Sequence, residues 1–252
     1  MLKINNAQVL KFKEHFVSDF ENELLIHVQN YFQGHYQMIG EDGIRNTIRY
    51  CLKKCKQYKF TTKRNICLYL NNMLMLGSNF DDDPQYPWGR TILKDVKFKD
   101  SVRHIDDISS NAMEVFEAIA GSDNKYINRY FLGITQQKDK LFQSLSDSNL
   151  KLNTEILYEW FPQKYETIKE QNIQKMVLAG YHFSEKYRIS KDSNIAIYIF
   201  MMFTGGSGFD TDPQYSPITG ILNSDLEEDQ KGKALFDKTI EMIQHFLKSE
   251  NS

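Results

Sequence analysis

The sequence has few cysteines and no long apolar run. The three cysteines among its 252 residues, Cys51, Cys55 and Cys67, all lie in the first half. An odd set confined to one half is a poor disulfide framework and indicates a reducing compartment. No segment approaches the roughly 20 consecutive apolar residues that a membrane-spanning helix needs. The amino-terminal residues carry no apolar segment of signal-peptide length, so we expect a cytoplasmic protein without a membrane partner.

An excess of charge of either sign is also missing. Lysine and arginine number 31 and aspartate and glutamate 33, which leaves a formal net charge of -2. Proteins that bind nucleic acid usually carry a basic patch or stripe. The local basic run Lys53-Lys54-Cys55-Lys56 is typical of a solvated helix face. We therefore expect no nucleic-acid partner.

The short motifs of common enzyme chemistries are absent from the sequence. It has no phosphate-binding loop, and its 6 histidines include no His-Glu-x-x-His pair. Gly205-Gly206-Ser207-Gly208 invites comparison with a hydrolase nucleophile elbow, but Phe209 stands where that motif needs its last glycine. We interpret this segment as a flexible helix exit. Cys51 and Cys55 have no second ligand pair at metal spacing, so they are expected to be small core residues.

A seven-residue motif occurs twice in the chain. Phe80-Asp81-Asp82-Asp83-Pro84-Gln85-Tyr86 returns 129 residues later as Phe209-Asp210-Thr211-Asp212-Pro213-Gln214-Tyr215. The same offset aligns other positions without a gap, among them Phe32 with Phe161, Tyr58 with Tyr187, Gly77 with Gly206 and Leu93 with Leu222. Because so many scattered positions keep register, the pattern indicates an internal duplication. We predict two tandem helical repeats, residues 1–122 and 123–252, packed about a pseudo-twofold axis.

Apolar residues recur at steps of three and four, which is the period of amphipathic helices. The first stripe predicts a long opening helix that ends before Gly34. Its members are Val9, Phe12, Phe16, Phe20, Leu24, Val28 and Tyr31. Thr61 or Thr62 is a suitable N-cap for a later helix, which Gly77 is expected to end.

The second half contains a nearly continuous apolar run from Ile195 to Met202. Such a run suits a buried strand as well as a buried helix. Its partner in the first half carries Asn71-Asn72 and helical spacing, so we predict a helix buried on most sides. A last amphipathic helix is expected at about residues 229–248. Alternating strand patterns are hard to find, and the predicted fold class is all-α.

The repeated acidic motif is the candidate functional element. Asp83-Pro84 and Asp212-Pro213 are typical of a helix N-cap followed by proline at the first helical position, and Asp81 and Asp210 are expected to hydrogen-bond the preceding turn. Carboxylates also bind Ca²⁺ or Mg²⁺, but the loop lacks the ligand spacing of an EF-hand, so we predict no metal site. A cap leaves the repeated glutamine and tyrosine unexplained, and these favour either packing between the halves or a partner surface. The candidate partner-binding residues are Asp81, Asp82, Asp83, Gln85, Tyr86, Trp88, Asp210, Asp212, Gln214 and Tyr215.

Several segments carry a resemblance to a known group of proteins. They are Gly77-x-x-Phe80-Asp81-x-Asp83-Pro84 with Pro87-Trp88, Gly43-Ile44-Arg45, and Asn65-Ile66-Cys67-Leu68-Tyr69. With these segments the chain resembles bacterial proteins of unassigned chemistry that are encoded beside type VI secretion effector and spike genes. The resemblance covers residues 1–95 well and residues 161–222 less well, where Ser216-Pro217 replaces Pro87-Trp88.

The resemblance implies a cytoplasmic helper in interbacterial competition. Its partner would be a cognate secreted effector or toxin, or a spike component. We favour an immunity protein that neutralises the toxin, and an adaptor that loads the effector is the alternative. A basic toxin such as a nuclease would suit the acidic loops. A metal-dependent enzyme acting through those loops and a structural dimerisation module are less favoured. The prediction is a non-catalytic binding protein, monomeric or homodimeric, with no catalytic residues and no cofactor.

Overall fold

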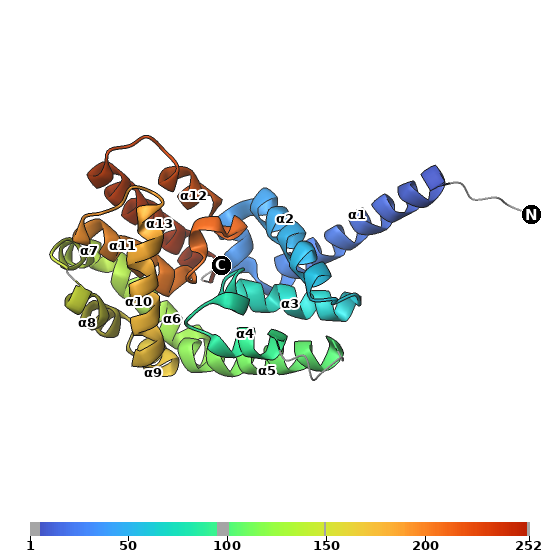
Figure 1. The fold of residues 1–252 in the computed structure, drawn as a ribbon, viewed down its shortest axis with the longest axis horizontal. Coiled ribbons are helices and arrows are strands. Elements are labelled where there is room, and N and C mark those ends of the chain that lie inside the picture. Colours follow the sequence, from blue (N-terminus) through green and yellow to red (C-terminus); the bar gives the residue numbers. More distant parts are fainter. Residues whose placement is uncertain (1–5, 95–100, 149, 251–252) are drawn as a thin grey trace, which may run out of the picture.

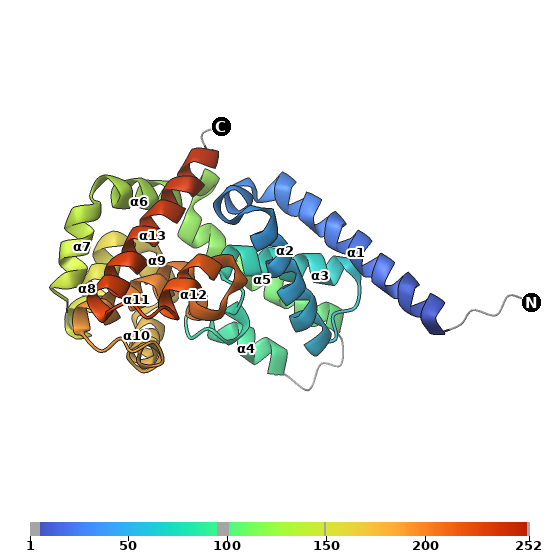
Figure 2. The same cartoon turned by 90° about the horizontal axis from the view of Figure 1, so that it is seen from above.

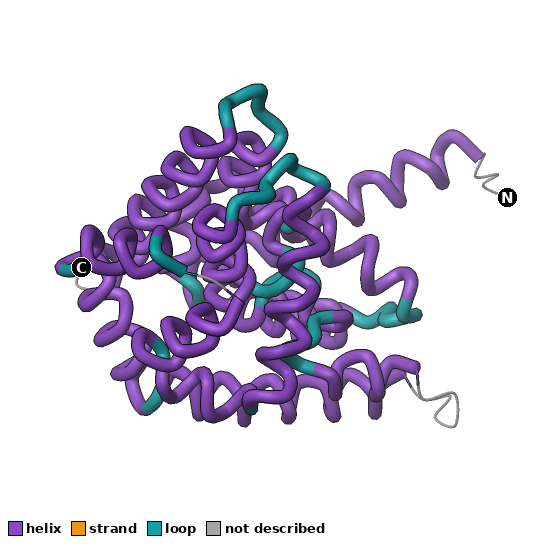
Figure 3. The backbone as a smooth tube through the Cα atoms, turned by 60° about the vertical axis from the view of Figure 1, so that its left-hand side comes forward, coloured by secondary structure: helices purple, strands orange, loops and turns teal. Residues whose placement is uncertain are grey.

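The computed structural model of the chain is built from helices. It describes residues 6–94, 101–148 and 150–250. Within these ranges, only the backbone is described for residues 6–17, 101–102, 150–153 and 249–250. The described residues form helices, turns and loops and include no strand (Figure 3). The all-α prediction is confirmed.

The first half opens with the predicted long helix. Its elements are α1 (Asn6–Tyr31), α2 (Gln33–Gln57), α3 (Lys63–Leu76), the 3-10 helix η1 (Phe80–Asp82), α4 (Pro87–Lys94) and α5 (Ser101–Ala120). Phe20, Leu24 and Val28 of the predicted stripe are buried, whereas Tyr31 is exposed; Val9, Phe12 and Phe16 lie outside the residues whose side chains are described. Thr62 caps α3 by accepting a hydrogen bond from the Asn65 N–H at 3.2 Å, as predicted.

The second half contains shorter helices before its last one. Its elements are η2 (Ser122–Asn124), α6 (Lys125–Gln136), α7 (Lys138–Ser146), α8 (Leu150–Trp160), α9 (Pro162–Ile168), α10 (Glu170–Glu185), α11 (Asp192–Gly205), η3 (Phe209–Thr211), η4 (Pro213–Tyr215), α12 (Ser216–Leu222) and α13 (Glu228–Glu250). Every side chain from Asn194 to Phe203 on α11 is buried, so the prediction of a helix buried on most sides is confirmed. The predicted boundary between the halves falls in η2.

The helices of the two halves lie on opposite sides of the molecule, and α1 projects away from the body (Figures 1 and 2). Contact between the sides is made by α13, which packs against α2, and by α5, which packs against α9. The buried apolar residues form one cluster that includes Met73 of the first half and Met202 of the second. The two halves therefore share a core. No helix in the described part of the chain combines the length and the apolar character that crossing a membrane requires.

Candidate functional site

The two copies of the acidic motif meet inside the molecule and bond to each other. The backbone N–H of Ser78 donates to Asp212 Oδ2 at 2.7 Å. In the reverse direction, the backbone N–H of Ser207 donates to Asp83 Oδ2 at 2.6 Å, and its hydroxyl donates to Asp83 Oδ1 at 2.6 Å. Hydrogen bonds to a charged acceptor are stronger than neutral ones. Each carboxylate therefore fastens its own loop to the other half.

The repeated glutamines make a second set of bonds between the halves. Gln85 Nε2 donates to the carbonyl oxygen of Met202 at 2.9 Å, and Gln214 Nε2 donates to that of Met73 at 3.1 Å. Both carbonyls belong to helices of the opposite half, α11 and α3. Of the two alternatives left open by the sequence, the glutamines serve packing between the halves.

Asp83 and Asp212 also bond their own loops. Asp83 Oδ1 accepts from the Gln85 N–H at 2.8 Å, and Asp212 Oδ1 accepts from the Gln214 N–H at 2.9 Å. Asp212 caps η4, so the predicted cap with proline behind it is present in the second copy. In the first copy the predicted helix start at Pro84 is wrong, because residues 84–86 form a turn and α4 begins at Pro87.

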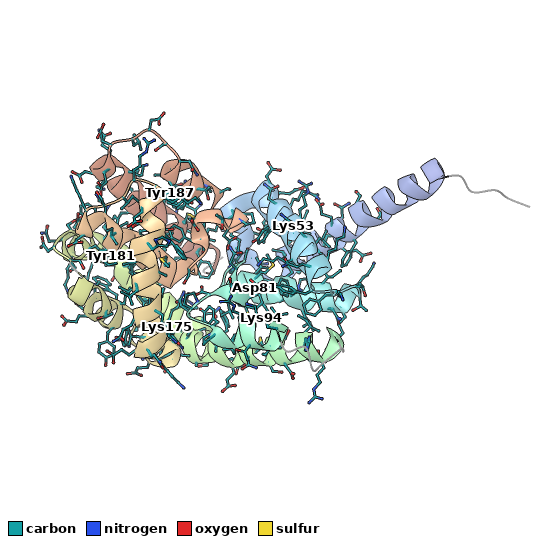
Figure 4. The ribbon with its side chains drawn as sticks, viewed as in Figure 1. Lys53, Asp81, Lys94, Lys175, Tyr181 and Tyr187 are labelled. Atoms are coloured by element: carbon teal, nitrogen blue, oxygen red, sulfur yellow. The ribbon has the colours of Figure 1, made fainter. Side chains whose placement is uncertain are left out.

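Asp81 and Asp210 do not bond the preceding turn as predicted. Asp81 accepts from Lys54 Nζ at 2.9 and 2.8 Å and from the Tyr58 hydroxyl, and Asp210 accepts from the Tyr187 hydroxyl at 2.8 Å. Figure 4 labels Asp81 in the first half and Tyr187 in the second. The turn satisfies its N–H groups with backbone carbonyls, as in the 3.0 Å bond from Asp82 N to Asn79 O, which leaves the carboxylates free for side chains.

The glycine segment is the exit of α11, as predicted, and it forms a tightly packed junction. Gly77 and Gly206 both have φ of +95°, a conformation that favours glycine. A Cβ on Gly77 would lie 2.8 Å from the carbonyl oxygen of Gly205, and one on Gly206 would lie 3.2 Å from that of Leu76. The exits of α3 and α11 therefore approach each other backbone to backbone.

Two basic side chains that the sequence analysis did not select lie beside this junction. Lys164 Nζ donates to the carbonyl oxygen of Phe203, and the His35 ring hydrogen-bonds that of Leu74. Lys164 follows His35 by the same 129 residues that separate the bonded pair Asn79 and Gly208. Burial lowers the pKa of Lys164 to about 8 and that of His35 to about 4. At neutral pH the lysine is thus mainly charged and the histidine neutral.

Burial also raises the pKa of the Asp83 and Asp212 carboxyls, to about 6 for Asp212. The hydrogen bonds from Ser207 and Ser78 act in the opposite direction because they favour the ionised form. For Asp83, the positive charge of Lys164 adds to this effect. Burying these two carboxylates in the junction therefore costs free energy, and their hydrogen bonds to the other half keep them in place.

Most of the candidate partner-binding residues lie inside the fold. Asp82 is exposed and pairs with Arg90 at 3.2 Å, and Trp88 and Tyr215 are half-buried. The buried ones are Asp81, Asp83, Gln85, Tyr86, Asp210, Asp212 and Gln214. The polar groups of Asp83, Gln85, Asp212 and Gln214 hold the two motif copies together, those of Asp81 and Asp210 bond within their own halves, and Tyr86 lines a cavity.

That cavity, which we call the junction cavity, has a volume of about 280 Å³ and lies between the halves. It is bounded by the exits of α3 and α11, and its polar lining includes His35, Lys164, Tyr86 and Tyr215. The sequence marked the tyrosines through the repeated motif. It gave no signal for His35 and Lys164, because the offset aligns two unlike residues there.

No metal-ligand set forms at the motif. Across residues 18–94, 103–148 and 154–248, whose side chains are described, no three His, Cys, Asp or Glu residues gather in a way that could hold a metal ion. Cys51 and Cys55 are buried in the core with their sulfur atoms 3.8 Å apart, as the prediction of small core residues requires. Burial raises the pKa of the Cys51 thiol.

A second hollow lies on the surface of the second half, between α8, α9 and α10, and we call it the α8–α10 groove. Its volume is about 660 Å³. It is lined by Thr154, Glu155, Tyr158, Tyr165, Glu170, Gln174, Val177 and Leu178. The rings of Tyr158 and Tyr165 in this lining meet edge to face, with centroids 5.3 Å apart.

Comparisons of the chain with protein-family models, with curated proteins and with solved structures find no match. The α8–α10 groove and the junction cavity are two of the hollows in the described part of the chain.

Proposed function

We propose that the protein binds a cognate secreted effector and neutralises it as an immunity protein. The α8–α10 groove is the observation that carries this proposal. Tyr158 is 49 % exposed and Leu178 is 61 % exposed, and both line the groove. Large apolar side chains that gather at an exposed hollow are typical of a protein-binding site. This surface takes the place of the motif loops, whose carboxylates, apart from the exposed Asp82, are engaged inside the fold.

The charge of the groove specifies the chemistry of its occupant. Glu155 and Glu170 line it, and no lysine or arginine is found among its described lining residues. Gln174 Nε2 donates to Glu170 Oε1 at 3.0 Å, which holds that carboxylate at the rim. The groove therefore suits an apolar segment with basic residues on a protein partner. A basic surface is what a toxin that acts on nucleic acid would present.

We also propose that the halves are an internal duplication packed about a pseudo-twofold axis. The reciprocal bonds of Asp83 and Asp212 and of Gln85 and Gln214 support this. Left-handed backbone supports it as well, because it recurs at the same offset: Gly40 (φ +69°) with Lys169 (φ +72°), Lys59 (φ +60°) with Arg188 (φ +58°), and Gly77 with Gly206 (both φ +95°).

The duplication makes the groove a feature of the second half alone. The positions that correspond to Gln174 and Leu178 in the first half are Arg45 and Arg49. Both arginines form ion pairs with Glu21, at 3.2 and 2.9 Å. In the first half, ion pairs therefore cover the surface that corresponds to the groove. In the second half the same surface is left open and apolar.

The proposal is tested with tagged wild-type protein and two variants of similar exposure. Leu178→Asp places a charge in the groove, and Leu132→Asp, on α6 at 50 % exposure, places one outside it. Each protein is used to capture partners from its native host, and the captured partner is then tested for toxicity in a growth assay. We expect a basic partner in stoichiometric amount, lost with Leu178→Asp and kept with Leu132→Asp, whose toxicity the wild-type protein abolishes.

Other outcomes are decisive as well. A partner that is lost with Leu178→Asp but whose toxicity persists would contradict the immunity role and support the alternative, an adaptor that loads the effector. A partner held equally well by both variants would show that the α8–α10 groove is not the binding site. Repeated failure to capture any partner would contradict the proposal.

A further inference from the structure

The junction cavity is lined by apolar side chains and by hydrogen-bond donors. Its apolar lining comes from both halves and includes Phe32, Met38, Phe116, Ile127, Phe131 and Phe246. Tyr31, which is 73 % exposed, also lines it, so the cavity opens to solvent there. A cavity of about 280 Å³ is roughly twice the ~150 Å³ that accommodates benzene.

Tyr86 is only 2 % exposed and lines this cavity together with Tyr215. Within the described part of the chain, no group is hydrogen-bonded to the hydroxyl of either tyrosine. Neither hydroxyl is among the fully buried polar atoms without a partner, so both remain open to solvent or to a ligand. The motif therefore offers two hydroxyl donors to whatever fills the cavity.

Lys164 adds a positive charge at the same place. It is 8 % exposed, and one of its three N–H groups donates to the carbonyl oxygen of Phe203. The negative charge of Asp83 favours the charged form of Lys164, whereas burial lowers the pKa of the lysine. The remaining N–H groups of Lys164 are free to serve a ligand in the cavity that it lines.

We infer that the junction cavity binds a small organic acid, with its carboxylate held by Lys164, Tyr86 and Tyr215 and its apolar body against Phe32 and Phe131. Two tyrosine hydroxyls and the remaining N–H groups of Lys164 line one cavity, and such a set of donors matches a carboxylate, which accepts through two oxygens. Pockets for small molecules typically combine an apolar lining with a few such polar groups. Because the cavity is built from both halves, the ligand would bridge them. This inference does not depend on the effector partner.

The test is a calorimetric titration of the whole protein at neutral pH with two acids that differ in their apolar part, phenylpropionate and octanoate. Phenylpropanol and octanol, which keep the apolar part but carry no charge, are the matched controls. We expect the acids to bind about tenfold or more tightly than the alcohols, the contribution of hydrogen bonds to a charged group. Failure of both acids to bind at about 10 mM, or equal binding of acid and alcohol, overturns the inference.

Two variants locate the binding. Tyr86→Phe removes only the hydroxyl, and Lys164→Met removes the charge while keeping a long apolar stem. Each is expected to weaken acid binding about tenfold or more and to leave alcohol binding unchanged. Because Lys164→Met also removes a bond to Phe203, Tyr86→Phe decides the matter if the lysine variant does not fold. Unchanged acid binding by Tyr86→Phe overturns the inference.

The pH dependence supplies a separate check. The pKa of Lys164 is about 8, so raising the pH from about 7 to about 10 removes its charge, and affinity for the acids should fall while that for the alcohols stays constant. His35 does not titrate in this range, because burial lowers its pKa to about 4. The pKa of Tyr86 is raised well above its ordinary value by burial. Constant acid affinity across this range contradicts the role of Lys164.

Discussion

Asp83 shows how one side chain can serve local and long-range structure at once. One oxygen accepts from the Gln85 N–H within its own loop, at 2.8 Å, and also from the Ser207 hydroxyl. The other accepts from the Ser207 N–H, at 2.6 Å, across the junction. The local role could be predicted from the Asp-Pro pair, because caps depend on neighbours in sequence. The cross-junction role could not, since it depends on a residue 124 positions away.

Removing this carboxylate should therefore cost more than the loss of a cap. A cap alone is worth about 1 kcal/mol. Asp83→Ala also leaves the buried Ser207 N–H and hydroxyl without an acceptor, so we expect a loss of about 3 kcal/mol in the free energy of unfolding, measured by urea denaturation. The neighbouring Asp82→Ala is the control, because Asp82 is exposed and should cost little. Equal effects of the two substitutions would contradict the cross-junction role.

Other residues of the site show where sequence reasoning has no signal. His35 and Lys164 bond the carbonyls of Leu74 and Phe203 at corresponding places, but as residues they have nothing in common beyond a nitrogen donor. A repeat search rewards identity, so it passes over such a pair. The burial that sets their pKa values comes from packing between the halves, which no local pattern encodes.

At the scale of elements, the short helix after the motif is the clearest difference between prediction and structure. Asp83-Pro84 suits both a helix start and a turn. Here the Gln85 side chain reaches across to the Met202 carbonyl at 2.9 Å, and the Tyr86 N–H closes a turn onto Asp83 at 2.9 Å. The helix begins at Pro87. The second copy makes the same two bonds, from Gln214 to the Met73 carbonyl and from the Tyr215 N–H to Asp212, and there Pro213 opens the short helix η4.

The exits of α3 and α11 depend on glycine for two separate reasons, and this gives a prediction. Gly77→Ala would place a side chain in left-handed backbone and 2.8 Å from the Gly205 carbonyl oxygen, a backbone atom that cannot move aside easily. We expect it to cost about 2–4 kcal/mol in the free energy of unfolding.

Gly133→Ala is the matched control for the effect of adding a methyl group. Gly133 lies inside α6, and a Cβ there would meet nothing within 4 Å. Alanine should stabilise this helix by up to about 1 kcal/mol. Thermal unfolding of both variants beside the wild-type protein measures the difference. A destabilisation of Gly77→Ala no larger than about 1 kcal/mol would show that the two exits do not meet as closely as described.

At the scale of the whole molecule, the helical class follows from apolar spacing, whereas the way the halves meet does not. The period of three and four is a local property, and it correctly predicted α1, α3, α11 and α13. Contacts between α13 and α2, or between α5 and α9, join residues far apart in the chain, so the apolar spacing does not predict them. The sequence pointed to this interface through the duplication and through the repeated glutamine and tyrosine of the motif.

The junction also predicts that neither half folds alone. Residues 1–122 expressed without the rest would expose the Met73 carbonyl and the apolar faces that α13 and α9 cover, and residues 123–252 would bury Asp212 without the Ser78 N–H. We expect each fragment to lack a cooperative thermal transition by circular dichroism, and an equimolar mixture to recover one. The shared core is the reason, because each half loses part of it. If either fragment melts cooperatively near the temperature of the intact protein, the halves are independent domains and the carboxylate and glutamine bonds only dock them.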